Sequence, residues 1–253
     1  MPQLEARRSC QQNSCYRRHT HETFSLGVIE SGRSLFTAGS GGVVCLQPGD
    51  VIAIPAGHVH ACNPEQGSWR YQMIHMDERW VAGLLPADGY SSLLSGISVL
   101  RGPELCRGFI EWSNLLFAGA GAARIEVGLS ALLAGLSHAQ PHRFISRSND
   151  PELSDRLGPV LDRLEHDAMN PRLDDLAHDA EMTKHQLVRE MRRATGLAPL
   201  AWRQNARVVR ARRMLRAGAP IAETAYALGF ADQSHFHRVF RAHVAASPGA
   251  YRG

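Results

Sequence analysis

Apolar and polar residues follow two different patterns along the chain, and the first is that of short strands. From residue 16 to residue 78, short apolar runs alternate with clusters of turn residues; the runs include FSLGVI (24–29), VVCL (43–46) and VIAIP (51–55). Strands of this length, separated by turns at roughly ten-residue intervals, are typical of a small barrel or sandwich. The pattern therefore predicts a β-domain in the first part of the chain.

After residue 79 the apolar residues recur at helical spacing. Two segments show this most clearly: residues 103–117 carry Phe109, Trp112 and Leu116 on one stripe, and residues 122–139 carry Ile125, Leu129, Leu132 and Leu136 on another. Such stripes predict amphipathic helices. These two helices either cover the β-domain or form a dimer surface, and the pattern leaves both alternatives open.

Residues 139–152 are polar and show no periodicity, so they predict an interdomain linker. Every segment after it, to residue 253, has helical spacing. The sequence therefore predicts an α+β multidomain protein. Residues 1–138 would form a β-barrel with two following helices, and residues 153–253 an all-α domain.

The all-α domain contains an internal repeat. Five positions recur 49 residues later with similar character: Leu187, Met191, Gly196, Pro199 and Trp202 correspond to Phe236, Phe240, Ala245, Pro248 and Tyr251. Each copy has the pattern of a short helix, a tight turn and a second helix with an N-cap. The caps are Thr183, with Gln186 completing a capping box, and Asp232. Two consecutive helix-turn-helix units are predicted.

The second helix of each unit has a polar outer face. The outward residues are Lys184, His185, Val188, Arg189 and Arg192 in the first unit, and Gln233, Ser234, His237, Arg238 and Arg241 in the second. Side chains of these types hydrogen-bond to base edges in the major groove and to phosphates. We therefore expect these two helices to contact double-stranded DNA.

One continuous helix is predicted between the units, over residues 199–218. Its buried side would carry Trp202, Ala206, Val209 and Leu215, with Arg203, Arg207, Arg210, Arg213 and Arg216 mostly outside that stripe. A rigid helix of this length would hold the two units so that they enter successive major-groove turns, about 34 Å apart.

The distribution of charge along the chain also favours a polyanionic partner. Residues 1–150 contain 12 basic and 12 acidic residues, whereas residues 183–253 contain 13 basic and three acidic residues, a net charge of +10. Phosphate contacts supply most non-specific affinity for nucleic acid. Charge alone does not distinguish DNA from RNA or anionic lipid, and the repeat is what favours DNA.

Composition excludes several classes of protein. Hydrophobic residues make up 44% and charged residues 21% of the chain, as in ordinary soluble domains. No apolar stretch approaches the roughly 18 residues of a membrane helix, and the basic N-terminal segment lacks the apolar core of a secretory signal. The five cysteines form no CxxC pair, so no disulfide framework is indicated. A cytoplasmic protein is expected.

The second unit, IAETAYALGFADQSHFHRVFRAHVAASPGAYR (221–252), resembles the signature of the AraC/XylS family of bacterial transcription regulators. The match covers about residues 170–253 and rests on Ala225, the Gly229–Phe230 turn, the Phe236/Phe240 pair and the terminal Pro248, Tyr251 and Arg252. The resemblance implies that the outward residues face bases or phosphates. It also implies a homodimer that contacts RNA polymerase, and activation as the commoner mode.

Three residues depart from the family pattern. Ala245 and Glu181 stand where glycine is common, and Glu190 occupies a usually apolar position. We expect the carboxylate of Glu190 to pair with Arg193 or Arg210, which would make the first unit the weaker DNA reader.

Residues 17–63 resemble the cupin-type barrel that many family members carry as an effector domain. RRHTHETFSLGVIESG (17–32) is similar to the first cupin motif and PGDVIAIPAGHVHACN (48–63) to the second. In metal-binding cupins these motifs supply three histidines and a glutamate. His19, His21 and His60 match, whereas the glutamate positions hold Ser25 and Leu26.

Two interpretations of the histidines follow. Three imidazoles can hold zinc or another divalent ion, with Cys62 or His75 as a conceivable fourth ligand; alternatively, they line a polar pocket for a small-molecule effector. Both lead to a DNA-binding regulator controlled by an effector in the barrel. The alternative function is a metal-dependent cupin enzyme fused to a DNA-binding domain. The missing glutamate disfavours catalysis, so no enzyme and no catalytic residue is predicted. Control by protein partners alone is a third possibility.

Overall fold

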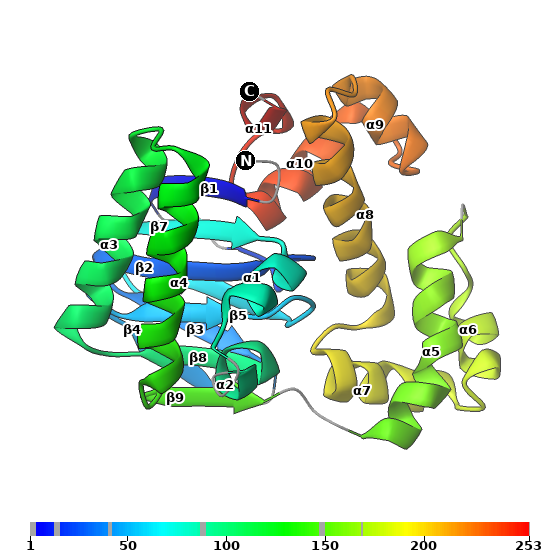
Figure 1. Ribbon diagram of the computed structural model, residues 1–253. Helices are drawn as coiled ribbons and strands as arrows, with labels where there is room; N and C mark the ends of the chain where they lie inside the picture. The colour runs from blue at the N-terminus through cyan, green and yellow to red at the C-terminus, as the bar shows by residue number, and fades with distance from the viewer. Residues whose placement is uncertain are drawn as a thin grey trace.

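The computed structural model describes residues 4–12, 16–39, 42–86, 90–146, 150–167 and 169–252. A β-rich N-terminal domain lies beside a helical C-terminal domain (Figure 1). The predicted α+β organisation is confirmed. None of the described helices is long and apolar enough to cross a membrane.

The N-terminal domain contains two antiparallel sheets. One has the strand order β1-β7-β2-β5-β8-β9 and the other β4-β3-β6. The strands are β1 (Leu4–Gln12), β2 (Phe24–Ser31), β3 (Ser34–Ala38), β4 (Val43–Leu46), β5 (Val51–Ile54), β6 (His60–Pro64), β7 (Ser68–Met76), β8 (Gly96–Leu100) and β9 (Arg143–Ser146). An isolated bridge between His19 and His60 joins the segment before β2 to β6.

The larger sheet is buried on both faces, which explains the uninterrupted apolar run in β5. Val51 and Ala53 pack in one cluster with the helices α3 (Pro103–Phe117) and α4 (Ala122–His138), while Ile52 and Ile54 pack in a second cluster with the other sheet. Successive side chains of a strand point to opposite faces. The two helices lie across the outer face of the sheet (Figure 1), so they do cover the β-domain. The short helices α1 (Glu78–Leu84) and α2 (Tyr90–Ser95) precede β8.

The predicted linker is shorter than the range 139–152. Residues Arg143–Ser146 form β9, which pairs with β8, and α5 already begins at Pro151. Of the four side chains in β9, only Ile145 is buried. One buried position gives no detectable period, so the sequence could not distinguish this edge strand from a polar loop.

The C-terminal domain contains seven helices among the described residues. They are α5 (Pro151–His166), α6 (Leu173–Asp179), α7 (Lys184–Thr195), α8 (Pro199–Arg216), α9 (Ile221–Ala227), α10 (Gln233–Val244) and α11 (Pro248–Arg252). One core surrounds Leu187 and Met191, and the other surrounds Phe236 and Phe240. The long helix α8 joins the two units (Figure 1). The tandem repeat is thereby confirmed.

The predicted caps begin both second helices. The hydroxyl of Thr183 accepts from the backbone N–H of Gln186, whose side chain accepts in return from the backbone N–H of Thr183. Asp232 accepts from the backbone N–H of His235 at 2.6 Å. Each cap satisfies a helix N-terminal donor that has no partner within the helix.

The buried face of α8 differs from the predicted one. Arg203, Asn205, Val208, Ala211 and Leu215 are buried, whereas the predicted Trp202, Ala206 and Val209 are only half-buried. Arg203, which was expected mostly outside the buried stripe, is 3% exposed. A guanidinium is buried only where its N–H groups all find acceptors.

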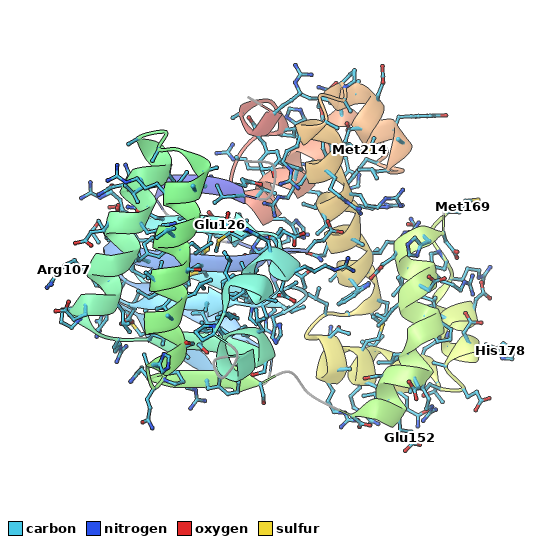
Figure 2. All side chains as sticks on the ribbon, viewed as in Figure 1. Arg107, Glu126, Glu152, Met169, His178 and Met214 are labelled. Carbon is cyan, nitrogen blue, oxygen red and sulfur yellow. The ribbon has the colours of Figure 1, made fainter. Side chains whose placement is uncertain are left out.

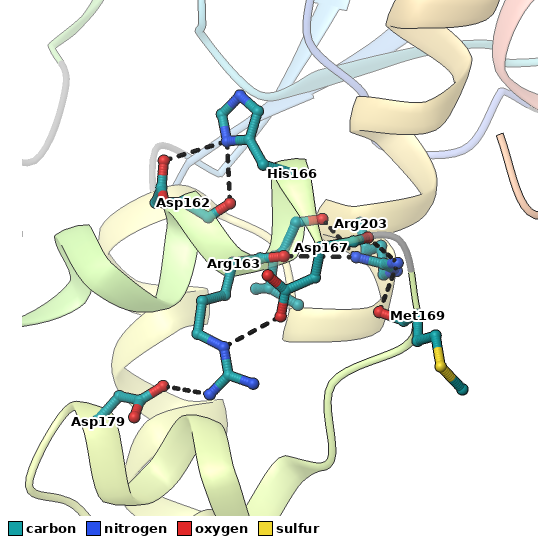
Figure 3. Close-up of polar contacts among 8 residues, drawn as sticks. Asp162, Arg163, His166, Asp167, Met169, Asp179 and Arg203 are labelled. Atoms are coloured by element: carbon teal, nitrogen blue, oxygen red, sulfur yellow. Dashed lines mark hydrogen bonds and ion pairs between the residues drawn. The ribbon is translucent and has the colours of Figure 1, made fainter. Parts of the chain in front are cut away.

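Those acceptors lie at the C-terminal end of α5 (Figure 3). Arg203 donates to the backbone oxygens of Leu164, Asp167 and Met169 at 3.0, 2.6 and 2.8 Å, and to Oδ1 of Asn170 at 2.8 Å. The last carbonyls of a helix have no partner within the helix and carry its negative dipole end. Arg203 therefore caps α5 from a distant helix and fixes α8 against the first unit.

We predict that Ala245→Gly stabilises the protein. Ala245 ends α10 with a φ of 52°, a left-handed conformation that costs an L-residue about 1–2 kcal/mol. Allowing for the greater freedom of glycine in the unfolded chain, we expect a gain of about 0.5–1 kcal/mol, seen as a higher midpoint of thermal unfolding. Ala217→Gly is the control because Ala217 ends α8 with a φ of −77°. A gain in the control equal to that of Ala245→Gly would contradict the prediction.

Candidate functional site

The ten residues predicted to contact DNA lie on α7 and α10. Eight of them are exposed, and Val188 and His237 are half-buried. The Nε2 atom of His237 is buried and has no hydrogen-bond partner among the described residues. Both helices therefore present a polar face, with His237 the least accessible of the second set.

The two faces differ in how far their side chains are already engaged. On α7, Glu190 accepts from Arg189 at 2.9 Å and from Arg193 at 2.7 Å, as expected for Arg193; Arg210 instead donates to a backbone oxygen of α5. Lys184 is paired with Asp174 at 2.8 Å. Among the described residues, neither Gln233 nor Arg238 on α10 makes a side-chain hydrogen bond or ion pair. The outward side chains of the second unit are therefore more available for contact with DNA than those of the first.

A pocket lies between the N-terminal domain and α8. It has an empty volume of about 880 Å³, its open mouth included. Its apolar lining includes Phe36, Ile54 and Trp69. The predicted histidines also line it, together with side chains of the C-terminal domain. Four of these come from α8: Asn205, Val208, Val209 and Arg212.

The structure brings His19, His21 and His60 together. One ring nitrogen from each lies within 4.8 Å of the others. The bridge between His19 and β6 sets the first and third rings 4.6 Å apart, centre to centre. His75, from β7, packs against His21 at 4.4 Å and accompanies this group of three. The three histidines that the sequence motifs indicated therefore lie side by side in the fold.

The hydrogen bonds of the rings determine which nitrogen is available. Nδ1 of His19 lies 2.7 Å from the backbone oxygen of Arg17, and Nδ1 of His60 lies 2.9 Å from that of His58. A carbonyl only accepts, so both rings carry their proton on Nδ1 and leave a lone pair on Nε2. Metal-ligating histidines are held in this way.

His21 has the opposite arrangement. Its Nδ1 lies 2.8 Å from Nη1 of Arg212, and a guanidinium only donates. Nδ1 of His21 is therefore the acceptor, and the proton of the neutral ring is on Nε2. His75 is adaptable, because its Nδ1 faces the hydroxyl of Ser25 at 2.8 Å, and a hydroxyl can donate or accept.

The three histidines fit a divalent ion of the zinc type if their ring nitrogens move closer together. Tetrahedral coordination at bond lengths near 2.0–2.1 Å places nitrogen ligands about 3.3 Å apart, closer than the 4.8 Å span. His19 and His60 already offer Nε2. Cys62 is a poor fourth ligand because burial raises the pKa of its thiol to about 12. Glu22 is paired with Arg213 of α8 at 3.2 Å. A fourth position would remain for water or a small ligand.

Arg212 is the centre of an interdomain cluster that the sequence did not reveal. Besides His21, it contacts both carboxylate oxygens of Glu5 at 3.3 Å and donates to the hydroxyl of Tyr251 at 2.9 Å. Glu5 also accepts from Arg216 and Tyr251. The side chain of Arg212 is 12% exposed. We call Glu5, His21, Arg212 and Tyr251 the interdomain lock. Its members come from β1, the segment before β2, α8 and α11.

Further contacts join the pocket segment to the DNA-binding domain. The backbone N–H of Arg17 donates to the oxygen of Ala242 in α10 at 2.9 Å. Thr20 and Asn205 exchange two hydrogen bonds, at 3.0 and 2.7 Å. Arg7 donates to the oxygen of Val244 at 2.7 Å, at the C-terminal end of α10. Helix α10, the second helix of the second unit, is thus held by residues next to the histidines.

The metal-free protein should lose stability on acidification. Burial is the largest cause that holds the pKa values of His19, His21 and His75 well below their usual range, with neighbouring histidines and Arg212 adding to it. Burial lowers the pKa of His60 to about 4. Below about pH 6.5 the unfolded chain binds protons that the folded protein does not. The free energy of unfolding therefore falls as the pH falls, by up to about 1.4 kcal/mol per pH unit for each such histidine.

Urea unfolding of chelator-treated protein, between about pH 6.5 and about pH 4, measures this slope. His60→Gln should make it shallower. The exposed His138 on α4 provides the control, and His138→Gln should change the slope less than His60→Gln does. An identical slope for wild type and His60→Gln would contradict the prediction.

Comparison with known proteins accounts for both domains. The family described as AraC-like ligand binding domain matches residues 2–183, and the family described as helix-turn-helix domain matches residues 176–253. The chain belongs to the AraC family of transcription regulators. It is 25% identical to the arabinose operon regulatory protein of Escherichia coli K12 over 218 residues, which are 83% of this chain and 73% of that protein.

Solved structures show the same two-domain fold. This AraC-family chain is similar to ToxT from Vibrio cholerae O395, with a TM-score of 0.61 and 14% identity over 100% of this chain and 98% of ToxT. Wild-type ToxT of strain SCE256, bound to an unsaturated fatty acid, gives a TM-score of 0.60 and 12% identity over 100% and 95% of the two chains. The chain is therefore a transcription regulator with a ligand-binding domain and a helix-turn-helix DNA-binding domain.

Proposed function

We propose that this AraC-family regulator responds to an effector in the pocket between its domains, and that occupancy changes how its DNA-binding domain is held. The observation that carries the proposal is that both domains line this pocket. Helix α8 of the DNA-binding domain supplies Asn205, Val208, Val209 and Arg212. An effector there contacts the DNA-binding domain itself. A differential contact of this kind shifts the balance between two domain arrangements, with a coupling of order 1–3 kcal/mol.

The effector that best fits the polar part of the pocket is a divalent transition-metal ion held by His19, His21 and His60. Two of the three rings already present Nε2, and neutral imidazole is a common ligand for such ions. A small organic effector is the second candidate. It is favoured by the apolar lining at Phe36, Ile54 and Trp69, and by the fatty acid bound to the structurally similar ToxT.

On this proposal, the ten predicted residues of α7 and α10 contact double-stranded DNA, and the protein activates transcription by contacting RNA polymerase in the cytoplasm. A homodimer would form through the outer faces of α3 and α4. Val127 is 71% exposed and Phe117 is 42% exposed on these helices, in keeping with an apolar contact surface.

Mapping of genomic binding sites in the source organism tests the regulatory function. We expect discrete sites for the wild type and their loss in Gln233→Ala/Arg238→Ala. Arg107 points outward from α3, on the proposed dimer face (Figure 2), so the control is Arg33→Ala instead; Arg33 is exposed and paired with Glu65 in the N-terminal domain, and its replacement should keep the sites. Absence of discrete sites for the wild type would contradict the proposal. Substrate turnover by metal-loaded protein would instead support a cupin enzyme fused to a DNA-binding domain.

A further inference from the structure

We propose that a divalent ion and Arg212 compete for His21, so that binding of the ion opens the interdomain lock. This inference rests on the proposed function and names its regulation. The lock joins Glu5 and His21 of the N-terminal domain to Arg212 and Tyr251 of the DNA-binding domain.

The competition follows from the single proton of a neutral imidazole. While Arg212 donates to Nδ1 of His21 at 2.8 Å, the ring proton is on Nε2, and that nitrogen has no lone pair for an ion. An ion at Nε2 requires the proton to move to Nδ1. There it would face the N–H of Arg212, donor against donor. An ion at Nδ1 would displace Arg212 directly. Neither arrangement keeps the hydrogen bond.

The other two ligands present no such conflict. Nδ1 of His19 and Nδ1 of His60 donate to backbone oxygens, and these bonds persist when Nε2 binds an ion. Among the described residues, His21 is therefore the member of the three that hydrogen-bonds directly to the DNA-binding domain. The histidine that completes the site is also the histidine that holds α8.

Electrostatics acts in the same direction. Arg212 is nearly buried, and the carboxylate of Glu5 is the acidic group in contact with it among the described residues. An ion bound by His21 adds two positive charges close to this guanidinium, in a region where screening by solvent is weak. The loss of one hydrogen bond and the added repulsion both favour separation of α8 from the pocket.

The coupling must be reciprocal. If docking of Arg212 weakens binding of the ion, the ion weakens docking by the same factor. A variant without the guanidinium should therefore bind the ion more tightly. We expect a gain of about tenfold for Arg212→Met, since a buried hydrogen bond and a factor of ten in affinity are of similar size. Methionine keeps most of the buried volume and has no donor.

The experiment uses chelator-treated full-length protein titrated with Zn²⁺ by calorimetry, and with Co²⁺, whose visible absorption reports tetrahedral coordination. The matched control is Arg213→Met. Arg213 also crosses the interface, to Glu22 at 3.2 Å, but makes no hydrogen bond to a histidine among the described residues. We expect tighter binding in Arg212→Met, wild-type affinity in Arg213→Met and no binding at this site in His19→Ala.

A second measurement needs no substitution. Hydrogen exchange of the wild type should become faster in residues 4–12 and 248–252 when Zn²⁺ is added, because both segments contribute to the lock. Equal Zn²⁺ affinity in wild type and Arg212→Met, or unchanged exchange on saturation with Zn²⁺, would overturn the competition. If genomic binding sites remain while either result is found, the inference fails and the regulatory function stands. If the sites are absent, the regulatory function fails first.

Discussion

Replacing Arg203 by methionine should lower the free energy of unfolding by about 3–5 kcal/mol, because several acceptors lose a charged donor at once and each buried group left unsatisfied costs about 1–3 kcal/mol. Arg203 is 3% exposed and donates to the backbone oxygen of Leu164 near the end of α5, to those of Asp167 and Met169 just after it, and to Asn170. Methionine fills much of the space but satisfies none of these acceptors. Urea unfolding followed by circular dichroism measures the loss, and hydrogen exchange of α5 should become faster.

Arg210→Met is the matched control on the same helix. Arg210 is exposed and donates to one backbone oxygen at 3.3 Å. Its replacement should change stability by no more than about 0.5 kcal/mol, as for most surface substitutions. Similar losses in the two variants would mean that the cap on α5 does not hold the first unit together.

Arg238→Ala should weaken binding to a specific DNA site by about 1–3 kcal/mol, or about 5- to 150-fold, if the side chain reads a base. Arg189→Ala should cost less. Arg189 is already paired with Glu190 at 2.9 Å, so this interaction must be given up before the side chain can contact DNA. Arg238 has no such competitor among the described residues.

The measurement compares the affinities of both variants for a site selected from random sequence and for random DNA, at one salt concentration. A loss confined to the selected site assigns Arg238 to base recognition, whereas equal losses on both DNAs assign it to phosphate contact. A larger loss for Arg189→Ala than for Arg238→Ala would contradict the predicted asymmetry between the units.

Periodicity and the internal repeat were sufficient to predict the two domains, the second helices of both units and their caps. These features depend on residues close together in sequence, such as Thr183 with Gln186. The short strand β9 lay beyond this kind of reasoning, because its one buried residue, Ile145, has no neighbour with which to form a pattern.

The candidate site was predictable in part, for a similar reason. His19, His21 and His60 belong to two short motifs, so the sequence indicated them, and the fold places them together. Arg212 stands in a helix rich in arginines, and nothing local separates it from its neighbours. Its role depends on Glu5 and His21, about 200 residues away in sequence, which only the packing of the two domains brings near.

One residue, Arg17, links the pocket to the DNA-binding domain without passing through the linker. The backbone oxygen of Arg17 accepts from His19, and its backbone N–H donates to Ala242 in α10. Any change that rotates the ring of His19 therefore acts on α10 through two hydrogen bonds, one between His19 and Arg17 and one between Arg17 and Ala242.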